Sequence, residues 1–316
     1  MRRTLLLASL LIASTLVNAQ GWPSKPIRYI VPFPPGGSSD LISRAIAPRL
    51  SEKLGQQIVI ENRPGAGGML GVDAVAKAEP DGYTIGLAAA GALSSNVFIY
   101  PKMPFDPLRD LVHVTPLAMI PFVLIAQPSL GSSLKEVLEK AKGGNLSYGH
   151  GGNGSTMHLS GELLNMLAGV KIQGVPYKGS GPVAADVLGG QVPLGMVDLP
   201  SALSHIRAGK VRALGVTSKK RLAVLPDVPT LDEAGVPGYE AIGWFGVVAP
   251  AKTPADIVNR LNHEIADALT VPEIRDRVVA AGTEPFTTSP QEFTAMIRAE
   301  TAKWGEVVRA GHIKAD

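Results

Sequence analysis

Short apolar or β-branched runs alternate along the chain with longer segments whose apolar residues recur at helical spacing. The pattern predicts strands at 27–33, 57–62, 83–90, 145–150, 192–198 and 211–218. It predicts helices at 39–55, 69–80, 132–142, 254–270 and 289–310. Strands and helices that alternate in this way predict an α/β fold with a mostly parallel sheet and right-handed crossovers.

The alternation occurs twice, which predicts two domains. It starts again after the apolar run "PFVLIAQP" at 121–128, and a second apolar run follows at 240–254. We place two crossing strands near 120–125 and 240–248, so that the first domain comprises 21–122 and 246–316 and the second 123–245. Each domain is expected to be a mostly parallel sheet flanked by helices. Roughly 295 mature residues are enough for two hydrophobic cores.

The segment 1–20, "MRRTLLLASLLIASTLVNAQ", has the order of a secretory signal peptide. Two arginines precede an apolar run, and small residues follow it, which predicts cleavage near Ala19. A permanent membrane anchor and an inner core helix are the alternatives. No later stretch approaches the roughly 18 uninterrupted apolar residues of a spanning helix, so the mature chain is expected to be soluble and exported.

Charge and cysteine content narrow the possible partners. Without Arg2 and Arg3, 28 basic residues face 27 acidic ones, a net charge of +1. This balance favours neither nucleic acid nor a membrane surface as a partner. Because the chain has no cysteine, disulfides, thiolate metal sites and cysteine nucleophiles are excluded.

Two glycine-rich loops, "PFPPGGSSD" (32–40) and "GHGGNGSTMH" (149–158), share one plan. Each follows a predicted strand, offers hydroxyl groups and opens a predicted helix. The first N–H groups of a helix have no partner inside it and carry the positive end of its dipole, so each loop is a candidate anion site. The alternative is an ordinary helix start in which Ser39 or Asp40 is only an N-cap.

Eight blocks of the sequence, in order, resemble one known family. They are "WPSKPIRYIVPFPPGGSSD", "VIENRPGAGGMLG", "DGYTIGLA", "HLSGELLNMLAGV", "VPYKGSGPVAADVLGGQV", "AGKVRALGVTS", "LPDVPTLDEAGVPGYE" and "WFGVVAPAKTP". They are similar to blocks of the Bug (TctC-like) substrate-binding proteins of bacteria. The resemblance implies a periplasmic Venus-flytrap protein of two α/β domains joined by two crossing strands. It also implies a small carboxylate ligand, held by backbone amides, hydroxyls and ordered waters more than by arginine.

The resemblance assigns ligand-binding residues to both loops and to two further walls. From the first loop they are Phe33, Pro34, Pro35, Gly36, Gly37, Ser38 and Asp40. From the second loop they are Gly152, Asn153, Gly154, Ser155, Thr156 and His158. Ala89 and Ala90 match the family's third wall, and Asp198 lies where the second domain can touch the far end of the ligand. Many relatives carry a hydroxyl residue near 89–92, where this chain has "AAGA", which leaves the distal end of the ligand open. Asp40 has two interpretations, as a cap of its own helix or as an acceptor for an ammonium or hydroxyl of the ligand.

Other chemical signals are weaker. "GAGGMLG" (65–71) fits a relaxed dinucleotide-binding pattern but lacks the acidic residue at the end of the next strand, so a tight packing turn explains it better. His158 and Glu162 are spaced to share a helix face, but no third metal ligand follows at a telling spacing. We therefore expect neither metal nor cofactor. Lys178 could attract an anion, and a solvated lysine is the alternative.

The combined expectation is a monomeric, non-enzymatic receptor for a small organic acid, either a carboxylate or an amino acid. Its partners would be the membrane subunits of a tripartite tricarboxylate-type transporter. A sensor that presents its ligand to a membrane kinase uses the same cleft and remains an alternative. An exported serine hydrolase is a further alternative, although the chain has no G-x-S-x-G elbow.

Overall fold

The computed structural model describes residues 21–310 and 314 of the 316-residue chain, so the predicted signal peptide at 1–20 lies outside the described residues. In chain order the elements are β1 (Ile27–Val31), α2 (Ser38–Leu54), β2 (Ile58–Asn62), η2 (Ala66–Gly68), α3 (Met69–Ala76), β3 (Thr84–Ala89), α4 (Ala90–Leu93), α5 (Asn96–Ile99), β4 (Leu111–Ala126), η3 (Pro128–Leu130), α6 (Leu134–Ala141), β5 (Ser147–His150), α7 (Thr156–Ala168), β6 (Gln173–Pro176), α8 (Ser180–Gly189), β7 (Leu194–Asp198), α9 (Leu199–Arg207), β8 (Arg212–Val216), β9 (Ile242–Pro250), α10 (Ala255–Thr270), α11 (Pro272–Ala280), β10 (Glu284–Pro285) and α12 (Pro290–Ala310).

The strands form one curled, mixed sheet in the order β2-β1-β3-β9-β4-β7-β5-β6, and β8 and β10 also pair with β4. β1 is parallel to β2 and β3, and β5 is parallel to β6 and β7. Every antiparallel pairing between the described strands involves β4 or β9. The predicted α/β class is therefore confirmed, with a parallel arrangement on each side of the two crossing strands.

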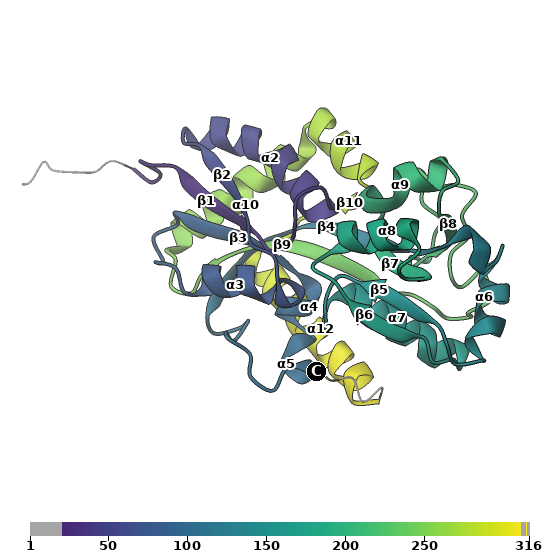
Figure 1. Ribbon diagram of the computed structural model, residues 1–316. Coiled ribbons are helices and arrows are strands. Elements are labelled where there is room, and N and C mark those ends of the chain that lie inside the picture. The colour runs from purple at the N-terminus through teal and green to yellow at the C-terminus, as the bar shows by residue number, and fades with distance from the viewer. Residues whose placement is uncertain (1–20, 311–313, 315–316) are drawn as a thin grey trace, which may run out of the picture.

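β4 carries the sheet from one half of the molecule to the other. Its residues from Leu111 to Pro121 pair with β9, and those from Phe122 to Ala126 pair with β7. We call the half that contains β1, β2 and β3 the first lobe and the half that contains β5, β6, β7 and β8 the second lobe; Figure 1 shows them on either side of β4 and β9. The predicted boundaries at 122/123 and 245/246 remain predictions.

Helix α2 shows how the sequence pattern fixes the first lobe. Its apolar residues Ile42, Ile46 and Leu50 are at most 1% exposed, and Gly55 ends the helix in the left-handed conformation with φ 70°. Helices α10 and α11 pack against α2. The amino end of α2 therefore has a fixed position relative to the sheet.

The predicted elements appear within a few residues of their predicted bounds, with some additions. Helices α4, α5, α9 and α11 and the short strand β10 were not predicted, and β4 begins at Leu111, well before the predicted crossing. The pairing of β4 with β9 shifts register between His113 and Thr115 and again between Pro116 and Ala118. These irregular, polar positions hide the first part of the strand from a search for uniform apolar runs.

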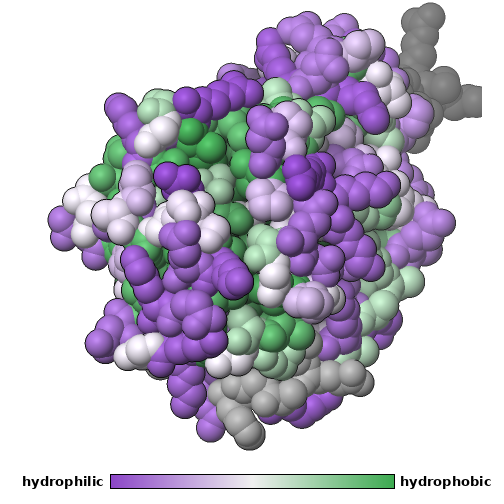
Figure 2. Space-filling view, turned by 90° about the vertical axis from the view of Figure 1, so that its right-hand side faces the viewer, coloured by the Kyte–Doolittle hydropathy of each residue, from purple (hydrophilic) through white to green (hydrophobic). Residues whose placement is uncertain are grey.

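Helix length and surface polarity complete the description of the fold. Among the described residues, no helix combines the length and apolar character needed to cross a membrane. Figure 2, which views the molecule from the right-hand side of Figure 1, shows hydrophilic residues interspersed with apolar ones over that face.

Candidate functional site

The first loop is braced from behind by Asp40. Gly36 has φ 93°, which glycine adopts without strain, and its N–H donates to Asp40 Oδ2 at 3.1 Å. Asp40 also accepts hydrogen bonds from Arg44 Nε and Asn62 Nδ2, both at 3.0 Å. The N-cap residue of α2 is Gly37, which makes no side-chain cap bond. The carboxylate is thus engaged by its own lobe, which favours the structural interpretation of Asp40.

The same contacts set the ionisation of this carboxyl group. Burial raises the pKa of Asp40, but the hydrogen bonds from Arg44, Asn62 and Gly36 and the charge of Arg44 outweigh burial, so the pKa is lowered overall. Asp40 therefore stays charged at neutral pH and forms an ion pair with Arg44.

Asp198 joins the second lobe to the first loop. Its Oδ2 accepts hydrogen bonds from the N–H of Ser38 at 2.9 Å and from the hydroxyl of Ser38 at 2.8 Å. Its Oδ1 accepts from the Ser201 hydroxyl at 2.6 Å. Asp198 is 5% exposed and Ser38 is fully buried. A carboxylate from the second lobe thus lies at the amino end of α2.

The second loop holds its glycine amides toward two histidines. The N–H of Gly152 donates to His150 Nδ1 at 3.3 Å, and the N–H of Gly154 donates to His158 Nδ1 at 3.2 Å. The two imidazole rings stack with centroids 4.4 Å apart. Ser155 caps α7, because its Oγ accepts from the His158 N–H at 3.2 Å. These two glycine amides are already occupied, so the loop would meet a ligand through other groups.

Ala89 and Ala90, the predicted third wall, are followed in the chain by Gly91, Asn96 and Tyr100, which were not predicted as site residues. A Cβ added to Gly91 would lie 2.3 Å from the carbonyl oxygen of Gly154, so the two lobes are in backbone contact here. The Tyr100 hydroxyl donates to the carbonyl of Asn153. Asn96 is fully buried beside Gly154, and its amide group has no hydrogen-bond partner among the described residues.

A cavity of about 20 Å³ lies where the lobes meet. Such a volume holds about one water molecule, so the lobes are closed. Its lining contains the predicted residues Phe33, Pro34, Pro35, Gly37 and Asp198. It also contains Ser39, Met157, Gly179, Ser180, Gly181 and Phe245, which were not predicted. Gly152 and Gly154 lie in the contact between the lobes, beside Gly67 and Asn96. The predicted residues that do not belong to the lining are Gly36, Ser38, Asp40, Ala89, Ala90, Gly152, Asn153, Gly154, Ser155, Thr156 and His158.

Four helices begin at this cavity. Gly37 precedes α2, Met157 lies in the first turn of α7, Ser180 begins α8 and Asp198 precedes α9. Each helix has the positive end of its dipole at this end. The N–H of Ser38 in α2 and that of His158 in α7 are already bonded, to Asp198 and Ser155. No lysine or arginine lines the cavity. The positive potential at the cavity therefore comes from backbone dipoles, and the carboxylate of Asp198 opposes it.

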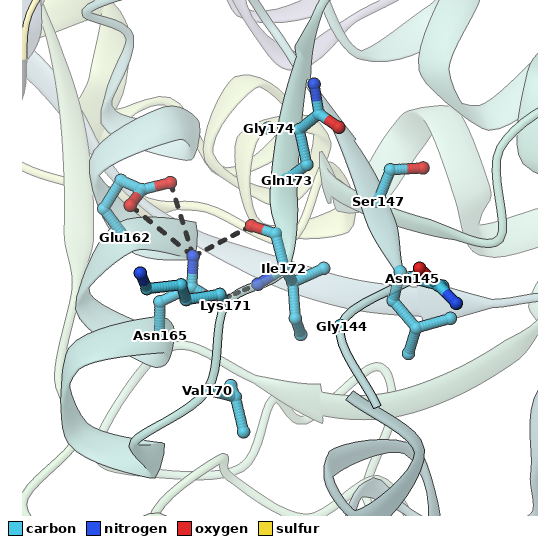
Figure 3. Close-up of a pocket in the computed structure, with 11 residues that line it drawn as sticks. Gly144, Asn145, Ser147, Glu162, Asn165, Val170, Lys171, Ile172, Gln173 and Gly174 are labelled. Atoms are coloured by element: carbon cyan, nitrogen blue, oxygen red, sulfur yellow. Dashed lines mark hydrogen bonds between the residues drawn. The ribbon is translucent and has the colours of Figure 1, made fainter. Parts of the chain in front are cut away.

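A larger cavity of about 700 Å³ lies elsewhere in the second lobe. It is lined at the amino ends of β5 and β6, by residues such as Ser147 and Gln173, and by Glu162 and Asn165 of α7 (Figure 3). Open α/β sheets bind ligands at the carboxyl ends of their strands. The small cavity satisfies this geometry, and the larger one lies at the opposite end of the same strands.

The serines near glycines are held by structural hydrogen bonds. Ser38 donates to Asp198, and Ser155 accepts from the backbone of His158. Ser180 accepts from the backbone N–H of Asp198 at 3.0 Å. None of these bonds joins a serine hydroxyl to an imidazole nitrogen, which is the contact that a serine nucleophile needs. Within 21–310 and 314, no cluster of three or more His, Cys, Asp or Glu residues could hold a metal ion.

Comparison with known proteins identifies the family. The family described as "Tripartite tricarboxylate transporter family receptor", TctC, matches residues 42–313. The chain belongs to the TctC family. Protein BugT of Bordetella pertussis is 40% identical over 297 residues, which cover 93% of this chain and 91% of BugT.

Solved structures of similar proteins have the same fold. R. palustris Rpa4515 with adipate has a TM-score of 0.89 and 39% identity, and the match covers 93% of this chain and 100% of that one. MatC of Rhodopseudomonas palustris with bound malate has a TM-score of 0.86 and 34% identity, and covers 91% of this chain and 100% of that one. The family is one of substrate-binding receptors, and these two relatives bind small carboxylates.

Acid is expected to destabilise the second loop through His150. Burial, followed by the nearby His158, lowers the pKa of His150 to about 3. In the unfolded chain His150 binds a proton below its ordinary pKa of 6.5, whereas in the folded protein it stays neutral down to about pH 3. The free energy of unfolding therefore falls as the pH drops from 6.5 to about 3. His150→Phe keeps the stacked ring but cannot titrate. Between pH 7.5 and pH 5, urea unfolding should show the wild type losing about 2 kcal/mol more than the variant. An equal loss in both proteins would show that His150 does not carry the effect.

Proposed function

We propose that this protein is a periplasmic receptor that captures a small organic acid, a carboxylate or an amino acid, between its two lobes. The observation that carries the proposal is the convergence of four helix amino ends on one cavity without a lysine or arginine. Such a site favours a negative ligand and recognises it through N–H groups and hydroxyls. The family is described as one of receptors, and we accordingly propose binding without catalysis.

The energy available from such a site is sufficient for a receptor. One helix dipole contributes about 0.3 to 1 kcal/mol when exposed and up to ~2 kcal/mol when partly buried. A typical hydrogen bond adds about 1 kcal/mol, or about twice that when it is made to a charged group. Four dipoles and several such bonds together supply most of the roughly 8 kcal/mol of micromolar affinity.

Closure follows from the division of the site between the lobes. Gly37 and Ser39 belong to the first lobe, whereas Met157, Ser180 and Gly181 belong to the second. A ligand held by one lobe completes its hydrogen bonds only when the other lobe arrives, so it favours the closed state. The membrane subunits of a tripartite tricarboxylate-type transporter would then recognise the closed monomer. The adipate and malate bound by the two relatives support a di- or hydroxycarboxylate as the ligand.

The proposal is tested by identifying what the protein carries. Protein purified from its native periplasm without denaturation should release one small carboxylic acid when it is unfolded, and mass spectrometry should detect it. The same acid, returned to stripped protein, should raise the melting temperature. A panel of mono-, di- and tricarboxylates, acidic amino acids and aromatic acids that produces no shift, together with turnover of an ester substrate, would exclude the receptor function.

A further inference from the structure

Asp198 provides a carboxylate at one anion position of the site, the amino end of α2. Its Oδ2 lies 2.9 Å from the N–H and 2.8 Å from the hydroxyl of Ser38, the first residue of α2. Charge-assisted bonds of this kind, at a helix amino end, are the contacts expected for a bound organic acid. Because α2 has 17 residues, its dipole is fully developed at this point.

A ligand carboxylate cannot use these donors while Asp198 occupies them. The N–H of Ser38 has a single hydrogen, and Asp198 accepts it. A Cβ added to Gly37 would already lie 3.1 Å from Asp198 Oδ2, so no space separates this carboxylate from the loop. The adjoining cavity, of about 20 Å³, admits about one water molecule. A ligand carboxylate placed beside Asp198 at Ser38 would also be repelled by its negative charge.

The contact joins the two lobes as well as filling the site. Ser38 belongs to the first lobe and Asp198 to the second. Two charge-assisted hydrogen bonds therefore join the lobes. When the lobes separate, Asp198 keeps its bond from Ser201, which lies in the same lobe, so that the carboxylate remains solvated and partnered.

We propose that Asp198 is an internal competitor of the ligand, which latches the lobes in the absence of ligand and must be displaced from Ser38 by the ligand's own carboxylate. The inference rests on the proposed function for the identity of the competing ligand. The latch itself needs only residues of this chain, Ser38 and Asp198. Asp198 thereby restricts which ligands bind. An acid displaces it only if the acid replaces both hydrogen bonds from Ser38 and makes further contacts of its own.

The latch is tested first without any ligand. Because the chain has no native cysteine, Glu79→Cys on the first lobe and Lys171→Cys on the second provide unique sites for spin labels, and both residues are exposed. The protein is unfolded, dialysed and refolded to remove bound small molecules before the inter-label distance is measured by pulsed electron resonance. We expect a short distance in the otherwise wild-type protein and a shift of most of the population to a longer distance with Asp198→Ala.

Ser201→Ala is the matched control, because it removes the other hydrogen bond of Asp198 and leaves the contact between the lobes intact. It should keep the short distance. An unchanged distance distribution in Asp198→Ala would overturn the latch, whatever the protein binds.

Competition is tested by titrating adipate into the wild type and Asp198→Ala and measuring heat. Removal of the internal carboxylate should raise the association constant for adipate about tenfold. Equal or weaker binding by the variant would overturn the competition. Failure of the proposed function would show separately, as native protein that releases no organic acid.

Discussion

Replacement of Gly91 by alanine is expected to prevent closure of the two lobes. The added Cβ would lie 2.3 Å from the carbonyl oxygen of Gly154 in the opposite lobe, a distance at which something must shift. The oxygen is a backbone atom and the position of the Cβ is fixed by the backbone of residue 91, so neither atom can rotate away. Gly91 lies in α4, where alanine is the better helix former, so the first lobe itself should fold normally. We expect affinity for the organic acid identified from the native protein to fall at least about 100-fold, the range of a strong conformational coupling.

Small-angle scattering would report the same change as an increased radius of gyration for Gly91→Ala. Gly189→Ala is the control, since Gly189 also lies in a helix but an added Cβ there meets nothing within 4 Å. It should leave affinity and dimensions unchanged. Wild-type affinity in Gly91→Ala would show that the ligand is bound without the contact between α4 and the second loop.

Gly37→Val is expected to abolish binding by filling the cavity. The backbone at Gly37 is extended, with φ −82°, so valine fits it without strain. Its side chain would project from a Cβ that lies 3.1 Å from Asp198, into a space of about 20 Å³. A thermal-shift titration with the native organic acid should show no stabilisation of this variant.

Lys178→Ala, in the same thermal-shift titration, is expected to bind the organic acid almost as well as the wild type. Lys178 is exposed and does not line the cavity, so its loss should change the affinity by less than about threefold, the scale of exposed ion pairs. If Lys178→Ala removed most of the affinity while Gly37→Val retained it, recognition by backbone dipoles would be wrong.

The architecture could be predicted from the sequence because it depends on local signals. The periodic apolar face of α2 and the end signal at Gly55 place a helix where the structure has one. The two glycine-rich loops predict where two helices begin. The alternation of strands and helices implies that both helices begin at the carboxyl ends of the strands. The family resemblance added the identity of the ligand class, which no single helix start specifies.

The missed parts of the site depend on contacts between distant segments. Nothing in the sequence around Ser180 and Met157 indicates a site. They line the cavity only because the folded sheet brings the amino ends of four helices together. Asn96 and Tyr100 lie in a short helix and its end, where no periodic pattern exists, and they become relevant only because the second loop packs on them. Likewise, the glycine amides at 152 and 154 look free in the sequence, and only the fold shows that His150 and His158 accept their hydrogens.

The position of β9 has a consequence for the order in which the chain can fold. β9 is formed by Ile242–Pro250, yet it lies between β3 and β4, near the middle of the sheet. As the chain emerges amino end first, the early strands β1, β2 and β3 lack the neighbour that joins them to β4. They must wait for some 150 residues of intervening chain, counted from the end of β3 at Ala89 to Ile242. The second lobe, whose strands β5 to β8 are contiguous, has no such delay. Until Ile242–Pro250 is available, β3 therefore lacks the strand that covers its edge in the folded sheet, and an unpaired edge of this kind favours aggregation.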